Sequence, residues 1–131
     1  MPVMTFGDRV TPEDIDILQP NQIFIFGSNM AGQHGGGAAK KAFDDFGAQW
    51  GIGEGLVNQT YAFPTLDAAY RRVSNTRLHA SRLKLYECAE RHPDKEFLLT
   101  KVGCGIAGFD EQKMKKLFAN APSNIIKPEG W

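Results

Sequence analysis

Two glycine-rich segments carry the residue types whose spacing is best suited to chemistry. Residues 27–39 read GSNMAGQHGGGAA, and residues 103–109 read GCGIAGF. Glycine has no Cβ, so a ligand can approach its backbone closely, and free N–H groups at a helix start favour an anion such as phosphate. A tight turn also needs glycine, but three in a row at 35–37 exceed that need. The expected ligand contacts are Gly27, Ser28, Asn29, Gly35, Gly36, Gly37, Gly103, Cys104, Gly105, Ile106, Ala107, Gly108 and Phe109.

Three polar side chains are expected near the same ligand. Asn29 and His34 belong to the first glycine-rich segment, and Asp67 follows an apolar stretch at residues 60–63. Amide, imidazole and carboxylate groups orient a substrate or a water molecule and transfer protons. Asn29, His34 and Asp67 are therefore the candidate catalytic residues. Capping of its own loop is the alternative role of Asp67.

The second glycine-rich segment contains the pattern G-x-G-x-x-G, which in dehydrogenases binds a dinucleotide. In those enzymes the pattern opens the first strand–helix unit, and an acidic residue roughly 20 residues later binds ribose. Here the pattern lies close to the end of the sequence, and no later strand carries such a residue. No Gly-Lys-Ser or Gly-Lys-Thr follows either segment, which excludes a Walker A kinase or ATPase. We interpret the segment as a phosphate-binding loop without a hydride-transfer role.

Two residues of the second segment have alternative interpretations. Backbone N–H groups around Cys104 can activate it as a nucleophile. A cysteine-dependent phosphatase needs an arginine shortly after the cysteine, whereas this sequence has Asp110 and Glu111 there. We therefore favour the interpretation of Cys104 as a small residue of the loop over that of a nucleophile. Phe109 either lies against a ribose or adenine face or packs as a hydrophobic staple.

The elements that must position these segments follow from the apolar pattern. Short apolar stretches predict strands at residues 23–26, 60–63, 97–102 and 124–127. Apolar residues at helical spacing predict helices at about residues 36–46, 75–91 and 110–121. Residues 51–56 are expected to form a lid or a surface loop. This alternation predicts an α/β fold with a mostly parallel sheet and helices on both faces, and both glycine-rich segments then lie at the carboxyl edge of the strands.

Composition and charge limit the class of protein. The length suits one domain spanning residues 1–131, and 15 Lys and Arg balance 15 Asp and Glu, so nucleic-acid binding is not expected. No apolar run is long enough to span a bilayer, and no signal peptide is recognisable. Two cysteines are too few for a disulfide scaffold, which indicates a cytoplasmic protein. The histidines lack partners at ligand spacing, so we expect neither a metal site nor a cofactor.

Several motifs together resemble a bacterial and bacteriophage family related to macro domains. Residues 25–39 carry the strongest likeness, and the other motifs follow in the order of the family. They are Phe46-Gly47-Ala48, Gly53-Glu54-Gly55-Leu56, Tyr61-Ala62-Phe63-Pro64-Thr65 and residues 103–109, preceded by Thr11-Pro12 and Pro20-Asn21. The resemblance extends over residues 11–131.

This resemblance implies a three-layer α/β/α sandwich with a mixed sheet and a site for ADP-ribose. Asn29 resembles the asparagine near the distal ribose of macro domains. Residues 35–37 resemble their first glycine loop, and residues 103–109 resemble the second, which surrounds the diphosphate. Gly7-Asp8 resembles the pair whose acid contacts adenine.

A small nucleotide of the ADP-ribose type is thus the expected partner, and two classes of function remain open. In an ADP-ribosyl hydrolase or an ADP-ribose phosphate phosphatase, Asn29 would orient the ribose or a water molecule, and His34 or Asp67 would act as general acid or base. In a non-catalytic module, for example a phage-encoded protein that sequesters a nucleotide signal, the same crevice would hold the ligand without turnover.

Overall fold

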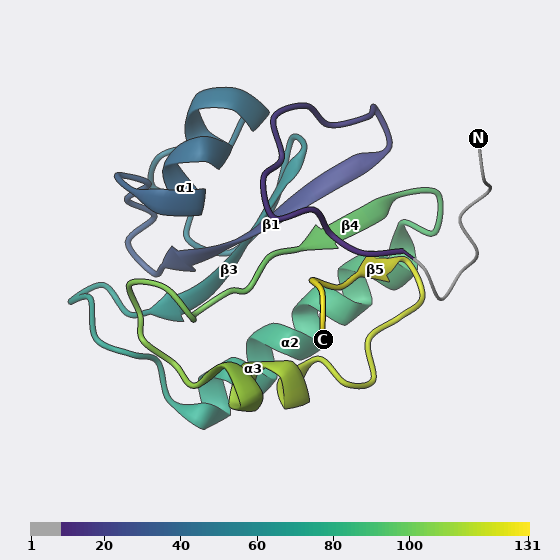
Figure 1. The fold of residues 1–131 in the computed structure, drawn as a ribbon. Coiled ribbons are helices and arrows are strands. Elements are labelled where there is room, and N and C mark those ends of the chain that lie inside the picture. Colours follow the sequence, from purple (N-terminus) through teal and green to yellow (C-terminus); the bar gives the residue numbers. More distant parts are fainter. Residues whose placement is uncertain (1–8) are drawn as a thin grey trace.

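A five-stranded mixed sheet forms the centre of the structure, a computed structural model that describes residues 9–131 (Figure 1). Its strands are β1 (Gln22–Asn29), β2 (Gly55–Val57), β3 (Thr60–Leu66), β4 (Glu96–Leu99) and β5 (Ile125–Ile126). Their order across the sheet is β2-β3-β1-β4-β5. All neighbours run parallel except β2, which pairs antiparallel with β3.

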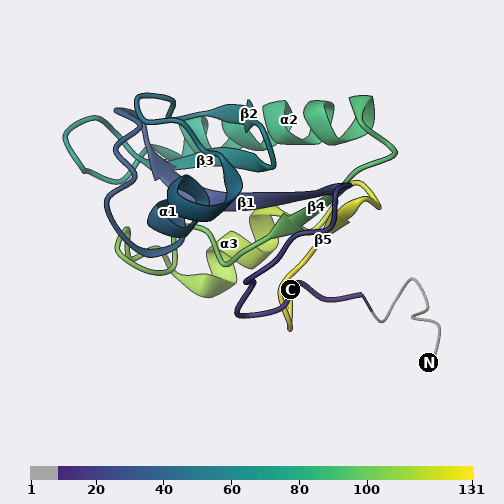
Figure 2. The same cartoon turned by 90° about the horizontal axis from the view of Figure 1, so that it is seen from above.

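Helices cover both faces of this sheet (Figure 1). On one face α1 (Gly37–Lys41) continues into a π-helical turn, η2 (Ala42–Phe46), and on the other lie α2 (Asn75–Arg91) and α3 (Glu111–Leu117). Seen from above, α1 lies over β1 (Figure 2). The expected three-layer α/β/α sandwich with a mixed, mostly parallel sheet is confirmed.

Alternate side chains of β1 enter two separate cores, which explains its continuous apolar sequence. Ile23 and Ile25 belong to the core shared with α2 and α3, whereas Phe24 and Phe26 belong to the core shared with α1 and η2. All four side chains are at most 4% exposed. Burial of each stabilises the fold by roughly 1.5–3 kcal/mol. Both cores therefore fix β1, and with it the glycine-rich segment that follows.

Residues 51–56, expected to be a lid or a surface loop, partly form a strand instead. β2 occupies Gly55–Val57 and joins β3 through a two-residue turn at Asn58 and Gln59. Asn58 has a φ of 52°, and asparagine tolerates this left-handed conformation better than most residues. A pairing this short depends on β3 being present, so the local sequence alone does not indicate it.

Two predicted elements are too long. The strand expected at 97–102 ends at Leu99, because Thr100 turns its hydroxyl to the carbonyl of Ile25 at 2.8 Å and the chain bends away from the sheet. The helix expected to reach residue 121 ends at Leu117, where Phe118 and Ala119 donate to carbonyls only three residues earlier. Within residues 9–131, none of the helices combines the length and apolar content that a bilayer crossing requires.

Candidate functional site

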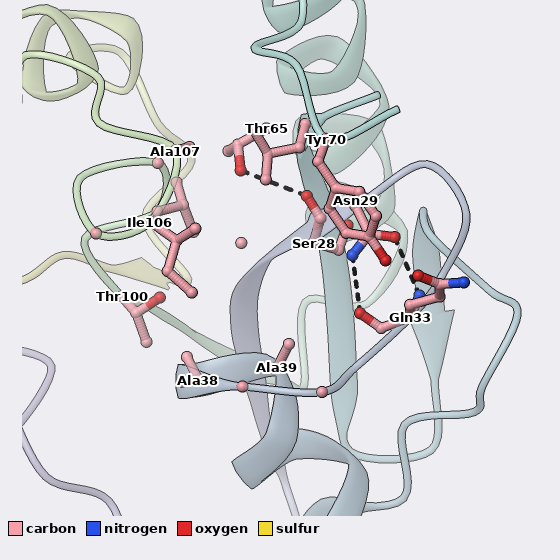
Figure 3. A pocket seen from close by; sticks show the side chains of 18 of the residues that line it. Ser28, Asn29, Gln33, Ala38, Ala39, Thr65, Tyr70, Thr100, Ile106 and Ala107 are labelled. Carbon is pink, nitrogen blue, oxygen red and sulfur yellow. Dashed lines mark hydrogen bonds between the residues drawn. The ribbon is translucent and has the colours of Figure 1, made fainter. Parts of the chain in front are cut away.

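A cleft of about 630 Å³ opens where β1 and β3 end and where the chain leaves β4 (Figure 3). Carboxyl ends of parallel strands are the usual position for a ligand in an open α/β sheet. Both glycine-rich segments contribute to this one cleft. The predicted contacts that line it are Gly27, Ser28, Asn29, Gly35, Gly36, Gly37, Gly103, Gly105, Ile106 and Ala107.

The three consecutive glycines face open space. A Cβ added to Gly35, Gly36 or Gly37 would meet no neighbouring atom within 4 Å, so packing inside the protein does not require glycine there; at Gly37 alone, a φ of 57° still favours it. Gly36 precedes α1 in an extended conformation, and no side chain caps the helix start. The first turn of a helix leaves backbone N–H groups without intrahelical partners. This wall of the cleft therefore presents bare backbone to whatever enters.

The second segment combines one tightly packed glycine with one open glycine. Gly103 has a φ of 79°, and a Cβ there would lie 3.0 Å from the Phe109 ring. A Cβ on Gly105 would meet nothing within 4 Å. Ile106, with 86% of its surface exposed, stands at the rim (Figure 3). The loop is thus held at its base and open at its tip.

Asn29 lines the cleft, but its side-chain amide hydrogen-bonds to the backbone of the first glycine-rich segment. Its Nδ2 donates to the carbonyl of Gln33 at 2.8 Å, and its Oδ1 accepts the Gln33 N–H at 3.0 Å (Figure 3). Ser28 donates its hydroxyl to the carbonyl of Gly53, behind the cleft. In this arrangement Asn29 shapes its own loop and Ser28 ties β1 to residue 53, while the Asn29 amide retains one hydrogen and spare acceptor capacity.

His34 lies outside the cleft. Its side chain is 1% exposed, and Nε2 is 2.8 Å from the carbonyl oxygen of Gln49. The ring meets Phe26 and Trp50 edge-on and packs at a tilt against Phe43. The geometry therefore gives His34 a packing role in place of the acid–base role expected from sequence.

Asp67 also lies outside the cleft and organises a turn. Its Oδ1 accepts the N–H groups of Ala69 at 2.8 Å and Arg71 at 3.0 Å. These backbone hydrogen bonds, that of Arg71 foremost, hold the pKa of the Asp67 carboxyl below its ordinary value. A depressed pKa makes Asp67 a poor proton donor at neutral pH, and loop capping is the role that the geometry supports.

The end of the second segment turns into the core. Phe109 is 7% exposed and belongs to the core shared with α2 and α3, with the cations of Arg72 and Lys113 near its ring, so the hydrophobic alternative applies to it. Cys104 and Gly108 are likewise absent from the lining of the cleft. The pKa of the Cys104 thiol is raised, chiefly by burial. A nucleophilic cysteine requires a lowered pKa instead.

Several lining residues escaped the sequence analysis because they come from other loops. Trp50 and Tyr70 line the cleft with 55% and 54% of their surfaces exposed, and Lys101 supplies a cation. Lys101 Nζ lies 3.0 Å from Glu111 Oε1, and this pairing raises the pKa of Lys101. Both side chains are about half exposed, so this ion pair is weak. It therefore does not prevent Lys101 from moving toward an anion in the cleft. For Trp50 the available sequence signal was its place directly before Gly51; Tyr70 and Lys101 have no comparable signal.

Three further features concern other parts of the chain. Within residues 9–131, no three His, Cys, Asp or Glu side chains are grouped so that they could hold a metal ion. Glu54 is 14% exposed and pairs with Arg77 and Lys84 away from the cleft. Gly7-Asp8, expected near adenine, lies outside the described residues.

Comparisons with known proteins complete these observations. No protein-family model and no curated protein matches the sequence. Among solved structures, the fold is similar to the macrodomain of Mycobacterium tuberculosis DarG, with a TM-score of 0.63 and 15% sequence identity. The match covers 91% of this chain and 95% of that macrodomain. The protein therefore has a macrodomain-like fold.

Proposed function

We propose that the cleft binds ADP-ribose or a related phosphate-bearing nucleotide. The observation that carries the proposal is the set of open glycines on both walls. Gly35, Gly36 and Gly105 have no steric reason within the protein to be glycine, yet each lines the cleft. A ligand whose phosphates approach the backbone closely supplies that reason.

The size and electrostatics of the cleft support the same ligand class. A volume of about 630 Å³ lies within the range of roughly 300–1,000 Å³ typical of small-molecule sites. Backbone N–H groups and Lys101 can balance a diphosphate without a cluster of cations. The sequence resemblance and the macrodomain-like fold add independent support.

Binding without turnover is the form of this function that the cleft supports best. Its lining, drawn entirely from the described part of the chain, contains no carboxylate and no imidazole. Imidazoles and carboxylates are the commonest general acids and bases, and such a group acts only within hydrogen-bonding reach of the substrate. The two candidates lie elsewhere: His34 directs Nε2, and Asp67 directs Oδ1, to backbone groups outside the cleft.

Binding is tested by calorimetry with ADP-ribose, AMP and NAD. We expect saturable heat with ADP-ribose and weaker binding of AMP, which lacks the second phosphate and the second sugar. Ligand at 100 times its Kd should raise the free energy of unfolding by about 2.7 kcal/mol, measurable as a shift in Tm. A Kd for ADP-ribose weaker than about 1 mM, equivalent to about 4 kcal/mol of binding, would contradict the proposal.

Turnover is tested separately by incubating the protein with an ADP-ribosylated protein and with ADP-ribose phosphate. Mass spectrometry should find both compounds unchanged after prolonged incubation, while calorimetry on the same preparation registers binding. Release of ADP-ribose or of phosphate that disappears in Asn29→Ala would instead establish the hydrolytic alternative.

A further inference from the structure

A strained tyrosine lies at one end of the cleft. Tyr70 has a φ of 62°, a left-handed conformation that non-glycine residues seldom adopt. Residues of this kind persist where the surrounding structure enforces them, and they cluster at ligand-binding positions. Tyr70 also lines the cleft and keeps 54% of its surface exposed, so the conformation is not needed to bury the ring.

The surrounding turn enforces this conformation through backbone contacts. The N–H of Asp67 donates to the carbonyl of Arg71 at 2.7 Å, and the N–H of Tyr70 donates to the carbonyl of Asp67 at 3.1 Å. The Asp67 carboxylate holds two more N–H groups of the same turn. On the far side, Arg72 Nε donates to the carbonyl of Ala107 at 2.9 Å. The turn is thereby fastened to the second glycine-rich segment.

The two sides of the cleft differ in chemistry. Figure 3 shows Tyr70 on the same side as Asn29 and Gln33, with Thr100 and Ile106 on the opposite side and open backbone between. Amide groups suit a ligand part rich in hydroxyls, and the face of an aromatic ring suits the C–H face of a sugar. The side bearing Tyr70 therefore fits a pentose.

We propose that Tyr70 is a specificity-determining residue that contacts the sugar beyond the second phosphate, and that Asp67 is the positioning residue that holds the ring there. This inference rests on the proposed function. Under this inference Asp67 contributes to binding by positioning Tyr70 and takes no part in proton transfer. It also predicts that the protein distinguishes ADP-ribose from ADP, which ends at the second phosphate.

The test compares the affinities of ADP-ribose and ADP, measured by calorimetry, in the protein and its variants. Tyr70→Ala should weaken ADP-ribose binding about tenfold, the equivalent of about 1.4 kcal/mol, and leave ADP binding unchanged. Tyr70→Phe should retain the preference, since it keeps the ring face. Asp67→Ala should lose the preference as Tyr70→Ala does, whereas Asp67→Asn, which still accepts N–H groups, should keep most of it.

Tyr70→Gly separates this role from a structural one. Glycine adopts positive φ without strain, so this variant should have an unchanged or higher Tm and yet lose the preference for ADP-ribose. Equal weakening of ADP and ADP-ribose, or an unchanged ratio of their affinities in Tyr70→Ala, would overturn the inference while leaving nucleotide binding established. Absence of binding by both ligands to the unaltered protein would instead refute the proposed function.

Discussion

Replacing Gly36 by leucine should abolish nucleotide binding while the protein stays folded. Gly36 has φ −157° and ψ 164°, an extended conformation open to any residue, and its Cβ position faces empty space in the cleft. A leucine side chain would occupy the volume beside α1 where the phosphates are proposed to lie. The affinity for ADP-ribose should fall at least a hundredfold, a loss of about 2.7 kcal/mol or more. Calorimetry provides the measurement.

The same substitution should cost little stability. Leucine is a poorer residue than glycine at a helix start, so the free energy of unfolding should drop by about 1 kcal/mol or less. Gly36→Ser restores a capping hydroxyl with a smaller side chain and should reduce affinity less. Ala80→Leu, an exposed change on α2 away from the cleft, is the matched control and should bind normally. A folded Gly36→Leu protein that binds ADP-ribose with unchanged affinity would exclude this cleft as the site.

The central strand of the fold could be predicted from sequence because its environment leaves a local trace. Residues 23–26 are apolar without interruption since β1 is buried on both faces, and that pattern appears in any short window. β2 leaves no such trace, because its three residues are only partly covered and are defined by pairing with β3. Residues 100–102 mislead in the opposite way: their apolar pattern suggested a strand, but Val102 is buried by packing outside the sheet.

The same distinction applies to the cleft. Three consecutive glycines exceed what a tight turn needs, so Gly35 and Gly36 were identifiable from the sequence as exposed backbone. A polar residue does not signal where its side chain points. The sequence around Asp67 does not reveal whether its carboxylate contacts a ligand or accepts hydrogen bonds from its own turn. In the structure it accepts two backbone N–H groups of that turn. Tyr70 reaches the cleft through the hairpin-like contact between Leu66 and Arg72, which follows only from the assembled fold.

Substitutions of the glycines in the first segment should differ sharply in their effect on the stability of the protein, although these glycines look alike in sequence. Gly32 has a φ of 71°, and an added Cβ would lie 2.3 Å from the carbonyl carbon of Gly51 and 2.4 Å from the nitrogen of Ile52. Both neighbours are backbone and cannot rotate away. Gly32→Ala combines this overlap with left-handed strain and should lower the free energy of unfolding by about 3 kcal/mol.

Chemical denaturation of Gly32→Ala and Gly35→Ala measures the contrast directly. Gly35 has open space at its Cβ position, so Gly35→Ala should change the free energy of unfolding by no more than about 0.5 kcal/mol. Gly32→Ala should also weaken ADP-ribose binding, because the hydrogen bond from Gly51 N–H to Gly32 O, 2.9 Å long, ties the loop beneath the cleft. Equal destabilisation by both variants would contradict the close contact between residues 32 and 51. Since that contact sets the path of the chain from Asn29 to α1, the proposed wall of open glycines depends on it.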